Sequence, residues 1–174
     1  MITRKEMTRM LLKEGLLSCL VNNSFESVTV TSLCKASGIT RSTFYLHYNN
    51  IMEIIDDLVD DAISYSRPGM VDNNNLQIIA KTLSAASNSV SLREAYDSIF
   101  DRLPLCQRII RHKKYLPLFL DEQISEYVLQ RIIGSEKDRQ GLVMAEALGI
   151  SFDVGVSVFV FLVHGLYAIN KEYK

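Results

Sequence analysis

Residues 29–48 read TVTSLCKASGITRSTFYLHY, and their pattern predicts two short helices joined by a tight turn. Thr29 can cap the free amides at the start of the first helix. The turn falls at Gly38, because glycine takes a positive φ angle at little cost. Thr40 then caps a second helix that runs through Tyr48. Two helices joined in this way form a helix-turn-helix, whose second helix can lie in the major groove of DNA.

The second of these helices is densely polar. Its hydrogen-bonding residues are Thr40, Arg41, Ser42, Thr43, Tyr45 and His47. Phe44 and Tyr48, four positions apart, remain to anchor it on a core. Leu33 and Ala36 face inward from the first helix. Arg41 can pair bidentately with guanine or with a phosphate, and the sequence leaves both pairings open. On periodicity alone, an ordinary helical hairpin with a solvated polar face also stays open.

The same segment resembles the signature of the TetR family of bacterial transcriptional regulators. That signature has threonine before the second helix, Gly-Val/Ile-Ser/Thr at the turn, then Thr-Leu/Phe-Tyr and His-Phe/Tyr. The resemblance covers roughly residues 5–60 and implies an all-helical homodimer, usually a repressor, which binds a palindromic operator and is released by a small molecule. It also implies DNA-facing or helix-seating roles for Thr29, Thr31, Ser32, Thr40, Arg41, Ser42, Thr43, Tyr45, His47 and Tyr48.

Three positions depart from the TetR pattern. Ser24-Phe25 stands where the family often has glycine before an aromatic residue. Cys34 replaces a small alanine, whose buried space a cysteine fills almost equally well. Ile51-Met52 stands where the family often has Lys-Glu, whose lysine contacts a phosphate. We therefore expect the backbone contacts to shift to Asn49, Asn50, Tyr45 and the N-terminal basic arm of Arg4 and Lys5.

Charge is distributed unevenly along the 174 residues, although the whole chain has a net charge of only −1. Residues 1–50 contain six Lys or Arg and three Glu, a net charge of +3, which leaves −4 for residues 51–174. A basic head on an acidic body is expected if only the head meets phosphate.

The sequence supports no enzyme class. The three histidines, His47, His112 and His164, lie in unrelated contexts, so no nucleophile with its base is indicated. The three cysteines are odd in number and far apart, which predicts neither a disulfide framework nor a metal site: Cys19, Cys34 and Cys106. We expect no cofactor, no metal and a cytoplasmic protein. The most apolar run, Val154–Val163, is too short to span a membrane, and the N-terminus has no signal-peptide pattern.

Helical spacing continues through the rest of the chain, so the predicted fold class is all-α. A first helix ends at Asn22-Asn23-Ser24 and has an apolar stripe of Met7, Met10, Leu11, Gly15 and Cys19, widened by Leu12 and Leu16. Turn signals at 67–69 and 72–75 mark a boundary. We predict a three-helix DNA-binding domain at 1–49, a connecting helix at 50–67, and a helical ligand-binding and dimerisation domain at 68–174. Further helices are expected at 76–89, 91–103, 105–112, 117–133, 137–148 and 152–173.

The connecting helix has acidic residues on one side, at Glu53, Asp56, Asp57, Asp60 and Asp61. Such a row can collect a hard divalent cation, but a solvated face is the commoner role. It can also repel DNA and confine contact to the head.

The last helix is apolar nearly all round, so a single chain is not expected to bury every face of it. We expect one face to pack on a second subunit, with Gly155, Ser157 and Gly165 permitting close helix approach. The resemblance likewise implies a homodimer through the helices at Pro117–Ile133 and Phe152–Tyr173.

A small, largely apolar effector is the remaining expectation. Its lining residues are predicted to be Tyr96, Phe100, Cys106, Tyr115, Phe119, Gln123, Met144, Phe152, Phe159, His164 and Tyr167. A sensor needs a cavity of about 300 Å³ or more. If these side chains simply pack on one another, the alternative is a TetR-like activator or adaptor that a protein partner controls.

Overall fold

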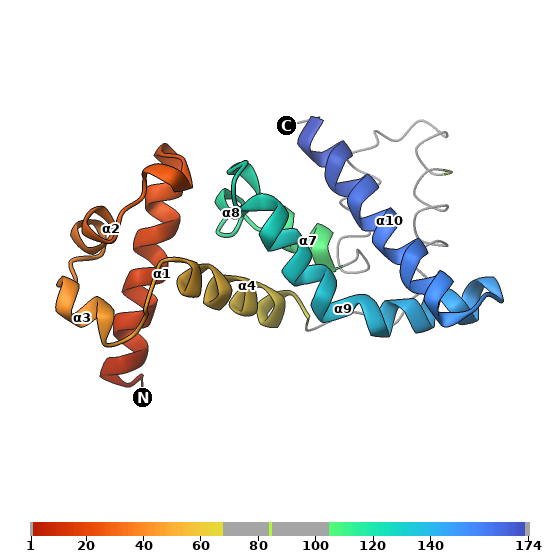
Figure 1. Cartoon of the computed structure of the whole chain (residues 1–174), viewed down its shortest axis with the longest axis horizontal. Helices are drawn as coiled ribbons and strands as arrows, with labels where there is room; N and C mark the ends of the chain where they lie inside the picture. The colour runs from red at the N-terminus through yellow and green to blue at the C-terminus, as the bar shows by residue number, and fades with distance from the viewer. Residues whose placement is uncertain (1, 68–83, 85–104, 173–174) are drawn as a thin grey trace. The chain divides into compact units, whose positions relative to one another are not determined.

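A computed structural model describes residues 2–67, 84 and 105–172 (Figure 1). Every regular element among these residues is helical, so the predicted all-α class is confirmed. The elements are α1 Arg4–Asn22, the 3₁₀ turn η1 Phe25–Ser27, α2 Val30–Ser37, α3 Arg41–Tyr45, α4 Met52–Ser66, α7 Leu105–Arg111, α8 Pro117–Leu120, α9 Ser125–Leu148 and α10 Phe152–Glu172. The helices expected at 76–89 and 91–103 lie outside the described residues.

The chain divides into two compact units. The first comprises Met1–Ser64 and Ile110–Arg131, and the second comprises Tyr65–Ile109 and Ile132–Lys174. The predicted connecting helix, 50–67, therefore belongs mostly to the first unit. Residues 110–131, which the sequence assigned to the C-terminal domain, also belong to the first unit.

Capping side chains begin the first three helices. At α1 the hydroxyl of Thr3 accepts a first-turn amide as part of a capping box. At α2 Thr29 Oγ1 accepts from the amide of Ser32 at 3.1 Å, and Ser32 Oγ accepts in return from the amide of Thr29 at 2.9 Å. At α3 Thr40 Oγ1 accepts from the amide of Thr43 at 3.2 Å. The predicted caps Thr29 and Thr40 are confirmed.

The link between α2 and α3 turns at Gly38, whose φ angle is 66° as predicted. The predicted extent of α3 is wrong, because the helix ends at Tyr45 and does not continue through Tyr48. The amides of His47 and Tyr48 both donate to the carbonyl of Phe44, at 2.9 and 3.0 Å, and this shared acceptor closes the helix in a tight turn.

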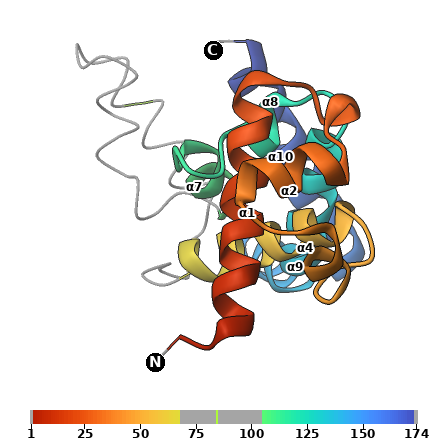
Figure 2. The ribbon, with the colours of Figure 1, turned by 90° about the vertical axis from the view of Figure 1, so that its left-hand side faces the viewer.

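The predicted apolar stripe of α1 is only partly correct. Met7, Met10 and Leu11 are 41, 39 and 39% exposed, whereas the buried residues of the helix are Thr8, Leu12, Gly15, Leu16, Leu17 and Leu20. The approach of α2 determines this face, because a Cβ atom on Gly15 would lie 2.1 Å from Ser37 Oγ. Figures 1 and 2 show α2 beside α1 from two directions.

The core of the first unit joins α1, α2, α3 and α4. Leu33 and Phe44 are fully buried and Tyr48 is 3% exposed, as expected for anchoring residues. Ala36 is exposed, which contradicts the predicted inward position, and Cys34 is buried in its place. From α4 the buried apolar residues are Ile54, Ile55, Leu58, Val59, Ala62 and Ile63.

The sequence predicted two helices, 117–133 and 137–148, with a break between them at 134–136. The position of that break is wrong. The break falls between α8 and α9, and α9 then runs without interruption to Leu148. Asp121 accounts for the break, because its Oδ1 accepts from the amides of Gln123 at 2.9 Å and Ile124 at 3.2 Å. These bonds cap the chain where it enters α9.

Glycines bring α9 and α10 close together in the second unit. A Cβ atom on Gly155 would lie 2.3 Å from the carbonyl oxygen of Gly141. A Cβ atom on Gly141 would lie 2.4 Å from Val156 Cγ2. Gly155 therefore permits a close approach within one chain. Gly149, with a φ angle of 65°, ends α9 as predicted.

One face of α10 is buried and another is exposed. Phe159 and Val163 are 5 and 2% exposed, whereas Val154 and Phe161 are 48 and 75% exposed. In the described part of the chain, no single helix is long and apolar enough to cross a membrane. The helices α9 and α10 pass that test of length and composition only as a pair, bent by 108°.

Candidate nucleic-acid interface

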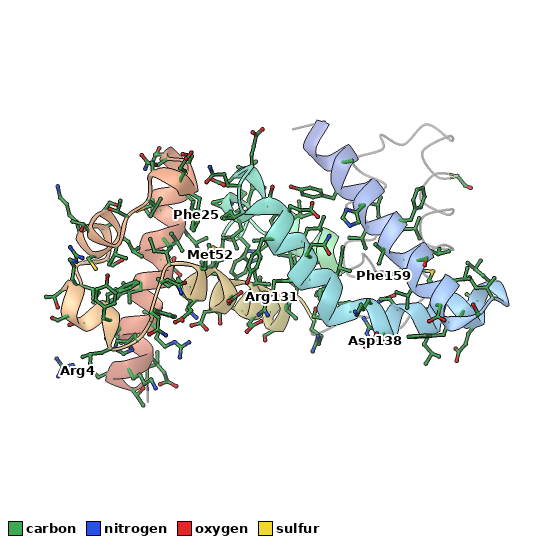
Figure 3. All side chains as sticks on the ribbon, viewed as in Figure 1. Arg4, Phe25, Met52, Arg131, Asp138 and Phe159 are labelled. Atoms are coloured by element: carbon green, nitrogen blue, oxygen red, sulfur yellow. The ribbon has the colours of Figure 1, made fainter. Side chains whose placement is uncertain are left out.

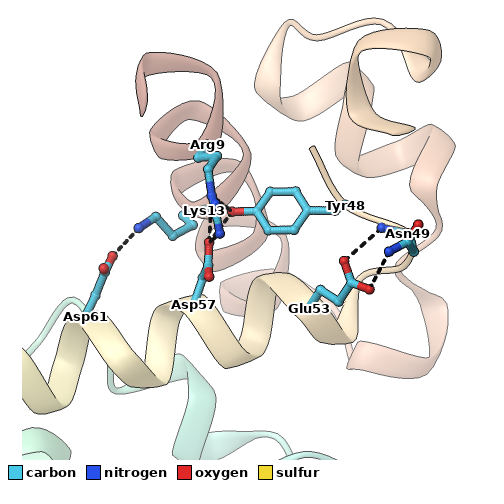
Figure 4. Close-up of polar contacts among 7 residues, drawn as sticks. All are labelled: Arg9, Lys13, Tyr48, Asn49, Glu53, Asp57 and Asp61. Atoms are coloured by element: carbon cyan, nitrogen blue, oxygen red, sulfur yellow. Dashed lines mark hydrogen bonds and ion pairs between the residues drawn. The ribbon is translucent and has the colours of Figure 1, made fainter. Parts of the chain in front are cut away.

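A three-residue contact joins α1, the end of α3 and α4 (Figure 4). Arg9 Nε donates to Tyr48 Oη at 3.2 Å and to Asp57 Oδ2 at 3.0 Å. The Tyr48 hydroxyl donates to the same carboxylate oxygen at 2.5 Å. The Arg9 guanidinium also lies over the Tyr48 ring, 5.1 Å from its centroid. Tyr48 is therefore a buried residue that anchors the end of the helix-turn-helix on α1 and α4, and it is not exposed for contact with DNA.

The electrostatics of this contact keep Asp57 ionised and Tyr48 protonated at neutral pH. Burial raises the pKa of Asp57, but the hydrogen bonds from Arg9 and Tyr48 outweigh burial and lower it overall. The pKa of Tyr48 is raised, first by burial and then by its hydrogen bond to Asp57. The pKa of Arg9 is raised by its hydrogen bonds to Asp57 and Tyr48.

A second ion pair repeats this contact one turn further along both helices. Lys13 on α1 pairs with Asp61 on α4, four residues beyond Arg9 and Asp57 respectively (Figure 4). At the start of α4, Glu53 accepts from the backbone amide of Asn49 at 2.9 Å and from its side-chain amide at 2.8 Å. These two bonds lower the pKa of Glu53. The Asn49 side chain, predicted to contact phosphate, therefore already has a partner in the helix cap.

The other side of α4 faces the first turns of α9. Arg131 contacts Asp56 at 3.4 Å and Asp60 at 3.1 Å (Figure 3). The Tyr127 hydroxyl donates to Asp56 at 2.5 Å. All five acidic residues of α4 thus have protein partners, but Asp60 and Asp61 remain 65 and 42% exposed, so the predicted solvated face is partly correct. No group of three or more His, Cys, Asp or Glu side chains is placed to hold a metal within the described residues.

Residues 110–131 are also attached to α1 and to the following turn η1. Asp121 Oδ2 accepts from the amide of Phe25 at 2.6 Å, and Gln123 Nε2 donates to Glu26 at 3.0 Å. Lys114 Nζ lies 2.7 Å from Glu14 of α1. These polar contacts explain why this stretch belongs to the first unit.

The ion pairs of α4 reduce the number of unpaired cations in the basic head, residues 1–50. Two of its six cations, Arg9 and Lys13, are neutralised by acidic residues of α4. The other four are exposed, and in the described part of the chain none of them forms an ion pair: Arg4, Lys5, Lys35 and Arg41. Among the cations of residues 1–50, these four remain available to a phosphate or a base.

The predicted DNA-facing residues separate into two groups. The hydroxyls of Thr29, Ser32, Thr40 and Thr43 take part in the helix caps. Thr31, Arg41 and Tyr45 are exposed and take no part in the caps, and Ser42 is exposed with its hydroxyl 3.0 Å from that of the cap residue Thr40. Arg41 Nη1 donates to Thr31 Oγ1 at 3.4 Å, a contact that links α3 to α2. Four exposed side chains therefore form a polar strip that combines a cation, hydroxyls and an aromatic ring.

Two residues of this region have features that the sequence did not indicate. Leu46, at the end of α3, is 81% exposed. Its spacing of four from Ser42 was the available signal, because it places both on one side of the helix. His47 is half-buried, and its Nδ1 is buried with no hydrogen-bond partner among the described residues.

The predicted effector residues are divided between the two units and the residues that the structure does not describe. Tyr96, Phe100 and the side chain of Cys106 lie outside it. Tyr115 and Phe119 are buried in the first unit, where Gln123 is also exposed on the surface. The other five belong to the second unit, with Met144 and Phe159 buried, Phe152 exposed, and His164 and Tyr167 half-buried.

A cavity described in the second unit has a volume of about 10 Å³. It is lined by Leu105, Ile132, Ile133, Glu136, Gln140, Phe159 and Val163. This volume suits one water molecule and not an effector. Glu136, 3% exposed, is held by Arg67 at 2.9 Å and Arg139 at 2.6 Å.

Comparisons of this chain with protein-family models, with curated proteins and with solved structures found no match.

Proposed function

We propose that this chain is a TetR-like transcriptional regulator, a repressor that binds a palindromic operator as a homodimer. One observation carries the proposal. The helix α3 exposes Arg41, Ser42 and Tyr45, while Phe44 of the helix and Tyr48 just beyond its end are buried. A short helix with a polar, cationic outer side, joined to another by a tight glycine turn, has the dimensions and chemistry of a major-groove reader.

In this proposal Arg41 pairs with a guanine edge, and Tyr45 and Ser42 contact neighbouring bases or phosphates. The exposed Arg4, Lys5 and Lys35 contact the DNA backbone. Because Arg9 and Lys13 are already paired, at most four of the six cations of the head can displace counterions from the DNA. We therefore expect a modest salt dependence from each subunit.

The homodimer is supported by the exposed side of α10. Val154 and Phe161 lie seven positions apart, which places both on one face of the helix, and both are largely exposed in the single chain. Burying such a face against a second copy removes apolar surface from water. A two-fold dimer sets the two α3 helices about 34–36 Å apart, or a multiple of one DNA turn, and so selects a palindrome.

Release from DNA is the regulatory part of the proposal. A small apolar molecule bound in the C-terminal region shifts the separation of the two heads only to the extent that it prefers the non-binding geometry. The alternative is an activator or adaptor controlled by a protein partner. That alternative is favoured by one observation, the cavity of about 10 Å³ in the described residues of the second unit. A cavity of this volume holds a water molecule and not an effector.

The test is selection of operators from random duplex DNA by the full-length protein, followed by affinity measurements. We expect one palindromic sequence to be enriched, and Arg41→Ala to weaken its binding by about 1–3 kcal/mol. Lys137→Ala, which removes an exposed cation from α9, is the charge-matched control and should bind normally. If no sequence is enriched, or if Arg41→Ala combined with Tyr45→Ala binds as wild type does, the proposal is refuted.

A further inference from the structure

Leu46 is the most exposed of the large apolar side chains in the described residues, at 81%. Its backbone has helical angles, φ −75° and ψ −16°, and its amide donates to the carbonyl of Thr43 at 3.2 Å. The side-chain direction of α3 therefore continues through Leu46, one residue beyond the end of the helix. This fixed position distinguishes Leu46 from an apolar residue on a loose loop.

Helical spacing places Leu46 on the proposed DNA-reading side. Arg41 and Tyr45 are four residues apart, as are Ser42 and Leu46, so the members of each pair share a side of the helix. The two pairs are adjacent, about 100° apart around the helix axis, so Leu46 lies beside Ser42 at the edge of the side that Arg41 and Tyr45 occupy. The Tyr45 ring is held edge-on against the buried Phe44 ring, with centroids 5.1 Å apart. Leu46 thus extends a strip that is otherwise composed of hydrogen-bonding groups.

We propose that Leu46 reads the 5-methyl group of thymine in the major groove, and so requires a thymine in each operator half-site. The inference rests on the proposed function, since it assumes that this side of α3 enters the groove. Among the four bases only thymine presents an apolar group there. A leucine side chain can gain only from contact with that methyl group. Against the polar edge of another base it would leave a donor or acceptor without a partner.

The charges around Leu46 favour DNA as the occupant over a second copy of the chain. Arg41 is exposed on the same strip, and Lys35 is exposed on the adjoining helix α2. The acidic residues of α4 are paired with Arg9, Lys13 and other protein groups. A cationic surface with one apolar side chain matches a polyanion that has methyl groups in its groove.

The experiment replaces each thymine of the selected operator by deoxyuridine, which removes only the methyl group, and measures the Kd of the full-length protein. One particular thymine of the half-site should be sensitive. Its replacement in a single half-site should reduce wild-type affinity roughly fourfold, equivalent to about 0.8 kcal/mol for one buried methyl group. Substitution in both half-sites should give a roughly fifteenfold loss. Leu46→Ala should bind the thymine and deoxyuridine operators almost equally. Leu120→Ala, which truncates an exposed leucine of α8, should retain the wild-type sensitivity.

Two results would overturn the inference while the proposed function stands. In the first, wild-type protein binds its operator but tolerates deoxyuridine at every position. In the second, Leu46→Ala loses as much affinity on deoxyuridine DNA as wild type does, so another residue contacts the methyl group. If Leu46→Ala instead changes the oligomeric state and not the methyl sensitivity, Leu46 is a self-association contact and the inference is wrong. If selection enriches no operator, the proposed function itself fails and this inference fails with it.

Discussion

Replacing Tyr48 by phenylalanine removes one hydroxyl from the contact between α1 and α4 and leaves the buried ring in place. That hydroxyl accepts from Arg9 at 3.2 Å and donates to Asp57 at 2.5 Å, so two charged groups lose a partner. Hydrogen bonds to charged groups contribute about 1.5–3 kcal/mol each. The side chains of Arg9 and Asp57 are 36 and 24% exposed, so water replaces part of the loss. We therefore expect the lower end, a decrease of about 1.5 kcal/mol in the free energy of unfolding.

Circular dichroism during urea unfolding, at one fixed protein concentration, measures this decrease. Tyr127→Phe is the matched control, because its hydroxyl also donates to a carboxylate of α4 at 2.5 Å but its side chain lies at the surface. We expect the control to lose under about 0.5 kcal/mol. Equal effects of the two substitutions, or a Tyr48→Phe effect below about 0.5 kcal/mol, would refute the argument that this buried hydroxyl organises the first unit.

Three further predictions concern the packing, the electrostatics and the dimer. Gly15→Ala should cost about 2 kcal/mol, because its Cβ would lie 2.1 Å from Ser37 Oγ, and adding Ser37→Ala should restore part of the loss in the same unfolding assay. Asp57→Asn should destabilise the protein at neutral pH. The folded-state pKa of Asp57 lies below its unfolded value of 3.8, so its contribution is complete above that pH and is lost as the pH falls through the folded value. The difference between Asp57→Asn and wild type should therefore shrink below pH 3.8 in urea titrations, and a constant difference would contradict the assignment. Phe161→Glu should convert a dimer into a folded monomer by light scattering, whereas Phe159→Glu, at a residue 5% exposed, should unfold it; a folded Phe161→Glu dimer would exclude this face of α10.

Local signals in the sequence predicted the starts and ends of several helices correctly. Thr29 and Thr40 cap the helices they precede, and Gly38 and Gly149 adopt the positive φ angles expected of them. Each of these features depends on a few neighbouring residues. A sequence pattern therefore contains nearly all the information that such a feature needs.

Features that depend on distant residues were predicted poorly. The acidic row of α4 indicated a solvated face, or less often a metal site, because the sequence does not show that Arg9 and Arg131 lie beside it. The break at Asp121 has the same origin, since its carboxylate also accepts from the amide of Phe25, far away in the chain. The buried face of α1 was misplaced because leucines and methionines surround the helix, and only the approach of α2 at Gly15 selects among them.

The central claim is that the exposed side of α3 recognises a DNA sequence. The ratio of Kd values for the selected operator and a scrambled duplex of equal length, at physiological salt, tests it most directly. A specific regulator should prefer its operator by at least about a thousandfold. Arg41→Ala should lower that ratio by roughly tenfold or more, because a lost base contact affects only the specific complex. A ratio near one for the wild-type protein, or a large ratio that Arg41→Ala leaves unchanged, would contradict the account.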